Sequence, residues 1–197
     1  MTENMAETIL AAMALLALGL HGLVPRLSLF ANLGARAKAD PEKRLLQVLQ
    51  VLVVLAMVVV PLCDALLPWF EFADVVFLDE AAWVGLMLGS AAIWLFWRAG
   101  RDRGPALAPC GTLRGGGVYR YLRYPVYAAM LLWALAQLLL LQNWLAGPVA
   151  ALTFTLAYLL RVPLEEQQNL ERHGHRYLDY MERTGGIIPR LTRSRSD

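Results

Sequence analysis

Two short stretches of this 197-residue chain combine residue types that could bind and position a small molecule. The first, residues 111–127, reads GTLRGGGVYRYLRYPVY, and the second, residues 160–167, reads LRVPLEEQ. Adjacent glycines let backbone N–H groups approach a ligand closely, and arginines offer fixed positive charge to a carboxylate or phosphate. Tyrosines add aromatic faces and hydroxyl groups, and the two glutamates add acceptors for hydroxyls, an ammonium or a sulfonium. This mixture suits a zwitterionic ligand with an aromatic base and an anionic partner molecule.

Each of these residue types also has a purely structural explanation. Arginines beside a membrane span usually set its orientation or contact lipid headgroups, and tyrosines there usually form an interfacial belt. Pro125 suits the first turn of a helix, and a glutamate pair after a span is commonly solvated. The interpretation as a binding site therefore depends on the two stretches lying together, not on any single residue.

Other kinds of site find little support in the sequence. The histidines, at positions 21, 173 and 175, and the cysteines, Cys63 and Cys110, show no metal-ligand spacing. No histidine neighbours a serine as in a hydrolase triad, and the triglycine at 115–117 follows an arginine-rich loop rather than a strand. A net charge of only +2 does not indicate a nucleic-acid-binding protein. We therefore expect neither a metal nor a nucleic-acid partner.

The elements that must position the two stretches are apolar helices. The chain is 58% hydrophobic and 17% charged, against about 45–50% and about 25% in soluble domains. Charge-free runs cover residues 8–25, 45–63, 81–97 and 124–160. Because a helix needs roughly 17–25 residues to cross the bilayer core, the first three runs fit one crossing each and the last fits two, with a turn at Gln142-Asn143. The sequence predicts an all-α fold with five transmembrane helices, near residues 8–25, 45–63, 81–97, 126–141 and 144–160.

Charges between these runs alternate in the way that five crossings require. The 26–44 and 98–123 connections are rich in lysine or arginine, whereas the 64–80 connection carries only acidic charges. The positive-inside rule then places the N-terminus outside and the C-terminus in the cytoplasm. Both ends of the last hairpin return to the cytoplasmic face, so residues 111–127 and 160–167 should be neighbours. Cys63 and Cys110 should lie on opposite sides, without a disulfide between them. We expect one domain, with a cofactor loop at 98–124 and a cytoplasmic helical cap at 161–197.

At these two stretches the sequence resembles the isoprenylcysteine carboxyl methyltransferase family and its phospholipid methyltransferase relatives. The family pattern is H-K-L-V-x-x-G-x-Y, then R-H-P-x-Y, a helical hairpin, R-x-x-x-E-E, and a G-x-x-Y-x-x-Y segment with a late proline. The corresponding residues here are Gly111–Arg114 with Gly117–Tyr119, Arg123–Tyr127, Arg161–Glu166, Gly174–Tyr180 and Pro189. The chain departs from the pattern at Gly111 and at Tyr124, where the family has histidines.

The resemblance implies a membrane-embedded methyltransferase that uses S-adenosylmethionine. It implies cofactor-binding roles for Gly111, Thr112, Leu113, Arg114, Tyr119, Tyr124, Pro125, Val126, Tyr127, Glu165 and Glu166. It also implies catalytic roles for Arg161 and Glu165, with Arg161 facing the substrate carboxylate. The cofactor would enter from the cytoplasm, and a prenylcysteine-like or other lipophilic acid would enter sideways from the bilayer.

The chemistry expected from this resemblance is methylation of a carboxyl oxygen. A carboxylate is already a nucleophile, so the protein needs to supply positioning and desolvation rather than a general base. A phospholipid amine, a phenol or a thiol are alternative acceptors, for which a base would be useful. A membrane relative without activity is a further alternative, and Tyr124 in place of the family histidine is the main evidence for it.

Overall fold

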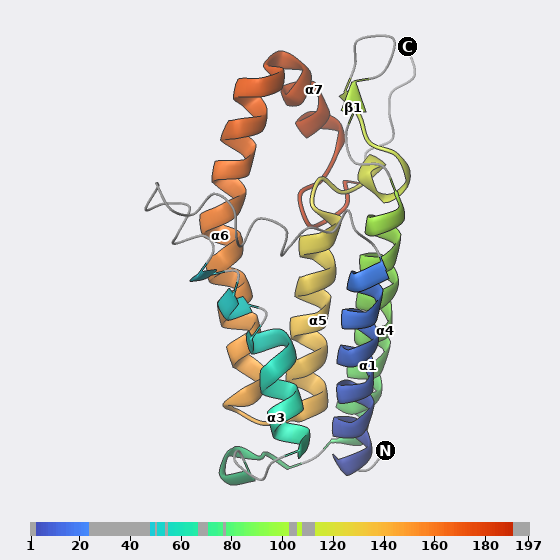
Figure 1. Cartoon of the computed structure of the whole chain (residues 1–197), viewed down its shortest axis with the longest axis vertical. Coiled ribbons are helices and arrows are strands. Elements are labelled where there is room, and N and C mark those ends of the chain that lie inside the picture. Colours follow the sequence, from blue (N-terminus) through green and yellow to red (C-terminus); the bar gives the residue numbers. More distant parts are fainter. Residues whose placement is uncertain are drawn as a thin grey trace.

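A computed structural model describes residues 3–23, 48–49, 51–53, 55–66, 71–76, 78–102, 106–107 and 113–190. The helical and strand elements within these ranges are α1 (Glu3–Leu23), η1 (Leu55–Val59), α3 (Val60–Leu66), η2 (Glu71–Ala73), α4 (Asp79–Arg101), β1 (Ala106–Leu107), β2 (Leu113–Arg114), η3 (Gly117–Arg120), α5 (Pro125–Leu141), α6 (Ala146–His173) and α7 (His175–Arg183). Helices α1, α3, α4, α5 and the lower part of α6 run along the long axis as a bundle, and α7 folds over at one end (Figure 1). The described residues confirm the predicted all-α class, with β1 and β2 forming one short antiparallel pair.

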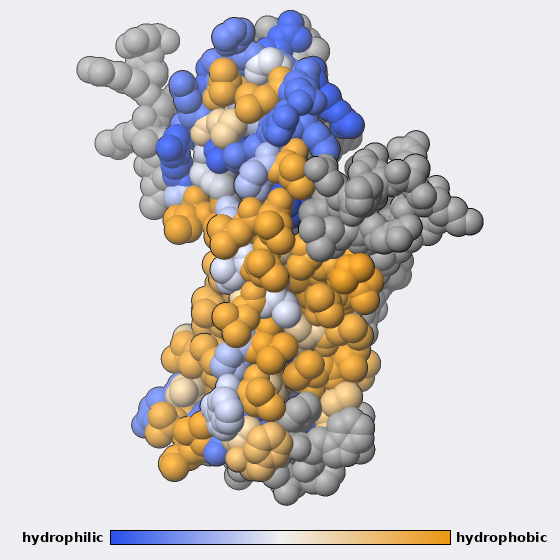
Figure 2. Space-filling view, turned by 90° about the vertical axis from the view of Figure 1, so that its left-hand side faces the viewer, coloured by the Kyte–Doolittle hydropathy of each residue, from blue (hydrophilic) through white to orange (hydrophobic). Residues whose placement is uncertain are grey.

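Two helices, α4 and α6, are long and apolar enough to cross a membrane. Only 28% of the apolar window of α4 and 22% of that of α6 are buried inside the protein, whereas the core helix of a soluble protein would be mostly buried. Figure 2 shows the result as an apolar zone over the bundle, with hydrophilic residues gathered at the α7 end. The count of five spans stays a prediction, because Met5–Ala17, Val51–Asp64 and Pro125–Leu141 are shorter apolar helices.

Small residues bring α4 close to α5 and α1. At Gly89 a Cβ would lie 2.6 Å from Cε of Met13 on α1 and 3.5 Å from Cβ of Ala136 on α5, so both helices approach this position closely. Without a hydrophobic driving force between helices in lipid, such close backbone approach is a principal source of association. The bundle is therefore held by contact between small faces, with Ala82, Ala92 and Ala136 buried along the seam.

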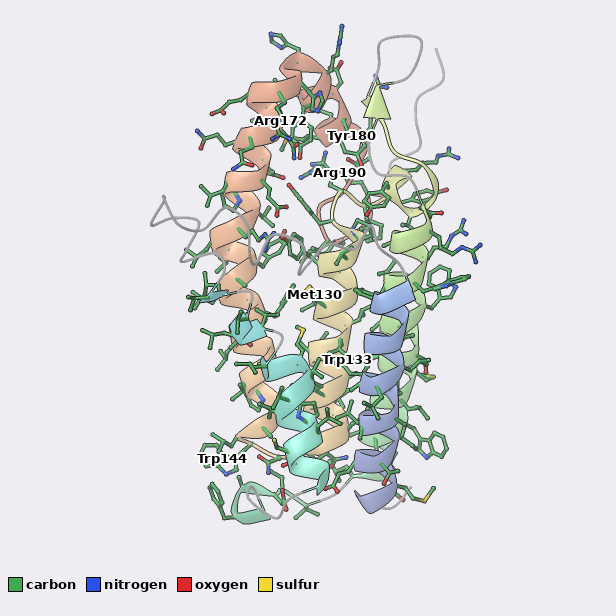
Figure 3. All side chains as sticks on the ribbon, viewed as in Figure 1. Met130, Trp133, Trp144, Arg172, Tyr180 and Arg190 are labelled. Atoms are coloured by element: carbon green, nitrogen blue, oxygen red, sulfur yellow. The ribbon has the colours of Figure 1, made fainter. Side chains whose placement is uncertain are left out.

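A proline leaves one backbone carbonyl inside the bundle free to bond side chains of a neighbouring helix. Pro61 has no N–H, so the carbonyl of Met57, four residues earlier, lacks its usual α-helical donor. Two side chains of α5 replace it: Trp133 Nε1 donates to this carbonyl at 2.9 Å and Gln137 Nε2 donates at 3.1 Å. Since an unpaired backbone carbonyl in an apolar environment is costly, these bonds fix α5 against η1. Figure 3 shows Trp133 on α5 within the bundle, well below the α7 end.

The α5–α6 hairpin turns at the predicted Gln142-Asn143 position. Gln142 adopts a left-handed conformation at φ 46°, and Asn143 Oδ1 accepts the N–H groups of Leu145 and Ala146 at 2.9 Å each, which caps α6. The segment that precedes α4 is hydrogen-bonded to this turn, since Asn143 Nδ2 donates to Asp74 Oδ1 at 2.7 Å. Both ends of the hairpin therefore lie at the opposite end of the bundle from this turn.

The last predicted helix differs from the observed one in length. Its expected range was 144–160, but α6 continues without a break from Ala146 to His173. Pro163 is accommodated inside it, although proline removes one intrahelical hydrogen bond. The expected boundary of the cap at residue 161 therefore lies within a continuous helix, and the boundary of the 98–124 loop lies within the last turn of α4, which ends at Arg101.

Candidate functional site

The two chemically suggestive stretches meet where α5 begins and α6 leaves the bundle. Tyr127, in the first turn of α5, donates its hydroxyl to Glu165 Oε1 at 2.9 Å. Arg161, one helical turn before Glu165 on α6, donates Nε to the same oxygen at 2.8 Å. The side chains of Arg161 and Glu165 are 30% and 32% exposed, so this Tyr-Glu-Arg cluster is open to a ligand. The proximity predicted from the hairpin topology is confirmed.

The next glutamate is held by a different arginine. Arg123, just before α5, places NH2 3.1 Å from Glu166 Oε1, and the two side chains are 15% and 24% exposed. The other terminal nitrogen of Arg123 donates to the carbonyls of Met181 and Thr184, at 2.9 and 2.8 Å. The Nε atom of Arg123 is buried without a hydrogen-bond partner. Arg123 thus faces the end of α7 as well as α6, and its guanidinium is committed to the protein.

Tyr124, which stands where the family pattern has histidine, turns toward the cap. Its side chain is buried at 9% exposure, and its hydroxyl lies 3.4 Å from that of Tyr177 on α7. Burial, with the hydrogen bond to Tyr177 as a second cause, raises the pKa of Tyr124 far above its usual value near 10. The phenol therefore stays neutral across the physiological range. Its ring lies 5.6 Å from that of Tyr127, which links the cap to the Tyr-Glu-Arg cluster.

An aromatic row continues from this point along α6. The ring of Tyr127 meets that of Tyr158 edge-on at 6.0 Å, and Tyr158 lies 5.9 Å from Phe154. Such pairs add about 0.5–1.5 kcal/mol each beyond their buried area. The row gives the Tyr-Glu-Arg cluster an apolar wall on the side of the apolar half of α6, while the α7 end is polar. A cation or an apolar chain can lie against such rings.

The glycine loop, residues 115–118, is used differently from the sequence-based expectation. One of its N–H groups, that of Val118, donates at 2.8 Å to Asp102 Oδ2 at the end of α4, rather than facing open space. Asp102 is also paired with Arg98 at 3.3 Å. Gly117 has φ +56°, and a Cβ there would collide with the Asp102 carboxylate. The Asp102 carboxylate therefore occupies the place beside the glycine loop where the sequence predicts a ligand.

Tyr119 follows this loop and is fixed by the cap. Its carbonyl accepts the hydroxyl of Tyr180 at 2.8 Å, so α7 holds both Tyr119 and Tyr124. Burial raises the pKa of Tyr119, with the negative charge of Asp102 as a second cause. Burial likewise raises the pKa of Tyr180. Tyr180 and Arg190 lie at the same end of the molecule, above α5 and its Met130 and Trp133 (Figure 3).

The remaining sequence-predicted site residues are placed less fully. Leu113 and Arg114 form β2, whose backbone pairs with β1, and β2 contacts α7. Pro125 is buried at the first position of α5, and Val126 beside it is half-buried. Gly111 and Thr112 lie outside the described residues. Among those described, no cluster of three or more histidine, cysteine or acidic side chains could hold a metal.

Three structural partners of the site have no assigned binding or catalytic role in the sequence prediction: Asp102, Arg123 and Tyr177. The signal for Tyr177 was present, because α7 is a short helix with tyrosines three residues apart in an otherwise charged sequence, and both are buried. The bonds of Arg123 to Met181 and Thr184 leave no such signal, since backbone carbonyls accept them.

Residues 106–171 match the model of the Isoprenylcysteine carboxyl methyltransferase (ICMT) family. Over this segment the chain is similar to the ICMT family. The matched segment runs from β1 almost to the end of α6, and it includes the whole Tyr-Glu-Arg cluster together with Tyr119, Tyr124 and Glu166. It ends before α7, so the cap that holds Tyr124 lies outside it.

Two curated relatives from Arabidopsis thaliana are similar to part of the chain. Protein-S-isoprenylcysteine O-methyltransferase A is 32% identical and Protein-S-isoprenylcysteine O-methyltransferase B is 29% identical to the chain, each over 77 residues. Each match covers 37% of this chain and 37% of the relative, so the likeness spans little more than a third of either protein. The ICMT family relationship therefore rests on the hairpin and the loop that precedes it.

Proposed function

We propose that this protein is a membrane methyltransferase that uses S-adenosylmethionine to methylate the carboxyl group of a lipophilic acid, such as a prenylated cysteine. The observation that carries the proposal is the Tyr-Glu-Arg cluster at the mouth of the α5–α6 hairpin, inside the segment that matches the ICMT family. The cluster lies between an apolar, membrane-facing wall and a polar cap. A lipid-borne acceptor and a water-soluble cofactor could meet at this point.

The residues present fit such a cofactor. Glu165 and Glu166 provide acceptors for its ammonium or hydroxyl groups, and the rings of Tyr124 and Tyr127 provide faces for a cationic sulfur or an aromatic base. When bound, S-adenosylmethionine would supply an electrophilic methyl group. Arg161 and the Tyr127 hydroxyl hold the Glu165 carboxylate in one orientation, so this acceptor would be set before the cofactor arrives.

The hydrogen bonding of the cluster favours a carboxylate acceptor over an amine. Glu165 and Glu166 each already accept a hydrogen bond from an arginine. Tyr124 stays a neutral phenol and is a poor proton acceptor. An ammonium, phenol or thiol acceptor would have to lose a proton to a base in this region, whereas a carboxylate is reactive without one. Arg161 would orient that carboxylate through its guanidinium.

Membrane insertion is part of the same proposal. The large exposed side chains of α4 include Trp83, Met87 and Trp94, which suits a helix in contact with lipid, with tryptophans toward each interface. We infer that the N-terminus lies outside and the α7 end in the cytoplasm. Labelling of intact and opened vesicles with a membrane-impermeant maleimide tests this, since Cys63 and Cys110 should react from opposite sides.

The activity can be tested on the full chain in detergent or lipid nanodiscs. We expect tritium from the labelled methyl group of S-adenosylmethionine to appear on a farnesylated cysteine, in a product that releases methanol under mild base, as an ester does. Arg161→Gln should raise the KM for this acceptor, whereas Arg172→Gln, on an exposed turn of the same helix, should leave it unchanged.

Three outcomes would contradict the proposal in different ways. No binding of S-adenosylmethionine at millimolar concentration would refute methyltransferase function and favour a non-catalytic relative. A base-stable methyl product would refute the carboxyl acceptor. Transfer to phosphatidylethanolamine vesicles but not to the farnesylated cysteine would show that the acceptor is an amine.

A further inference from the structure

The chain returns to the site after α7 and pairs with the loop that precedes α5. Residues 184–186, here called the C-terminal strap, lie beside residues 121–124 in a short parallel arrangement. Gly185 N–H donates to the carbonyl of Tyr121 at 3.0 Å, and its own carbonyl accepts the N–H of Arg123 at 2.7 Å. The N–H of Tyr124 donates to Gly186 at 3.2 Å. The backbone position of Tyr124, at the start of α5, is thus set by a segment some 60 residues later in the chain.

Arg123 reinforces this pairing with its side chain. One guanidinium nitrogen donates to the carbonyls of Met181, in the last turn of α7, and Thr184, in the strap. The carbonyls at the end of a helix lack intrahelical donors and carry partial negative charge, so a buried cation is a strong partner for them. Arg123 therefore caps a helix to which it does not belong.

The same guanidinium reaches the candidate site. Its second terminal nitrogen lies 3.1 Å from Glu166, which neighbours Glu165 of the Tyr-Glu-Arg cluster. One side chain therefore joins the loop before α5, the middle of α6 and the end of α7. This double attachment depends on the planar fork of arginine, because a lysine ammonium is a single point charge.

The strap itself tolerates little change. A Cβ at Gly185 would collide with the carbonyl of Ile188, so the turn that brings the strap onto the loop requires glycine. Beyond the strap, Arg190 NH1 donates to the carbonyl of Glu182 at 2.9 Å, which closes the segment back onto α7. Both the strap and α7 lie beyond residues 106–171, the segment that matches the ICMT family.

We propose that Arg123 is a positioning residue that couples closure of the C-terminal strap to the cofactor site. This inference rests on the proposed function. With the strap closed, Arg123 fixes Glu166 and the backbone of Tyr124 together; with it open, both lose their positions. Coupling of this kind is reciprocal, so a ligand that requires the closed strap must also stabilise it. If the Arg123 contacts served stability alone, ligand binding would not change the protection of the strap.

The test compares Arg123→Gln with Arg120→Gln in the full chain. Arg120 is a matched control, because it lies three residues earlier in the same loop but is exposed. Within the described part of the chain, the contact given for its guanidinium is with the ring of Tyr121, whose centroid lies 5.9 Å away. Hydrogen exchange at the amides of Arg123, Tyr124 and Gly185 reports the strap. Equilibrium dialysis with S-adenosylmethionine reports the cofactor site.

We expect S-adenosylmethionine to slow exchange at these three amides in the wild type. Arg123→Gln should abolish that protection and raise the cofactor dissociation constant about tenfold or more, while Arg120→Gln should change neither. Arg123→Lys should give an intermediate effect, since it can keep one of the two attachments. Gly185→Ala opens the strap with Arg123 intact, so it should reproduce the loss if the Arg123 variant does not fold.

Two results would overturn the coupling. In one, the cofactor binds wild type and Arg123→Gln equally. In the other, the strap amides exchange faster in the variant but are not protected by S-adenosylmethionine in the wild type, which would leave Arg123 with a structural role only. These results differ from failure of the proposed function, in which the wild type itself does not bind the cofactor.

Discussion

Glu165 offers the sharpest test of the candidate site, because one of its oxygens accepts two hydrogen bonds. Glu165→Ala removes the acceptor of both the Tyr127 hydroxyl and Arg161 Nε. The hydroxyl bond to a charged acceptor contributes about 1.5 kcal/mol. The Arg161 pair, one helical turn apart and partly exposed, adds about 0.5 kcal/mol. The substitution should therefore lower the free energy of unfolding by about 2 kcal/mol.

That loss corresponds to a fall of about 4–8 °C in the midpoint of thermal unfolding for a chain of this size. Tyr127→Phe removes only the hydroxyl bond and should cost about 1.5 kcal/mol, or about 3–6 °C. Glu171→Ala is the matched control on the same helix, since Glu171 is exposed and, among the described residues, accepts a single hydrogen bond, from Gln167 at 3.2 Å. It should leave the midpoint within about 1 °C of wild type.

The measurement is tryptophan fluorescence during thermal unfolding of the full chain in one detergent at one heating rate. S-adenosylmethionine should raise the midpoint of wild type and of Glu171→Ala, but not that of Glu165→Ala. The double variant with Tyr127→Phe should resemble Glu165→Ala alone, because the two changes remove the same bond. Additive effects, or equal losses from Glu165→Ala and Glu171→Ala, would refute the reasoning.

Three further predictions concern the glycine loop and Tyr124. Gly117→Ala should cost at least about 1 kcal/mol more than Gly174→Ala, measured by thermal unfolding; both glycines have positive φ, but only at Gly117 would the new Cβ meet the Asp102 carboxylate. Above pH 10, Tyr124 should contribute a loss of about 1.4 kcal/mol of stability per pH unit, because the unfolded chain releases that proton while the folded phenol retains it. Tyr124→Phe should lower the slope of stability against pH by that amount, while Tyr119 and Tyr180, whose pKa values are also raised, keep contributing to it. Tyr124→His should introduce a loss of stability as pH falls through about 6.5, because a buried imidazole must charge, whereas wild type should show no such step in thermal scans over pH 5–8.

The positions of the helices could be predicted largely from where charge is missing. The run without charges from Tyr124 to Leu160, with the Gln142-Asn143 turn, predicts the α5–α6 hairpin, and the hairpin predicts that its two ends meet. The length of α6 could not be predicted from apolarity, because its last 13 residues, after Leu160, are mostly polar and continue the helix by backbone hydrogen bonding.

The finer site geometry depends on partners that sequence patterns do not display. Arginine-rich loops suggest ligand or headgroup contacts, yet the guanidinium of Arg123 donates to backbone carbonyls, which every residue possesses. The glycine run suggests backbone N–H groups that are open to a ligand, yet the N–H of Val118 donates to the Asp102 carboxylate of the same chain. In both cases the competing group comes from a distant part of the chain, so only the folded arrangement reveals it.

The length of α6 has a consequence for where chemistry can occur. At about 1.5 Å per residue, its 28 residues extend about 42 Å, which exceeds a hydrocarbon core of about 30 Å. In the proposed membrane arrangement, one end of this helix lies in lipid and the other in water. Arg161 and Glu165 flank Pro163 at the transition between these halves. In the proposed reaction, the lipophilic acid would remain in the lipid and the charged cofactor would remain in water. The two would meet at this one turn of α6, so neither would have to enter the other phase.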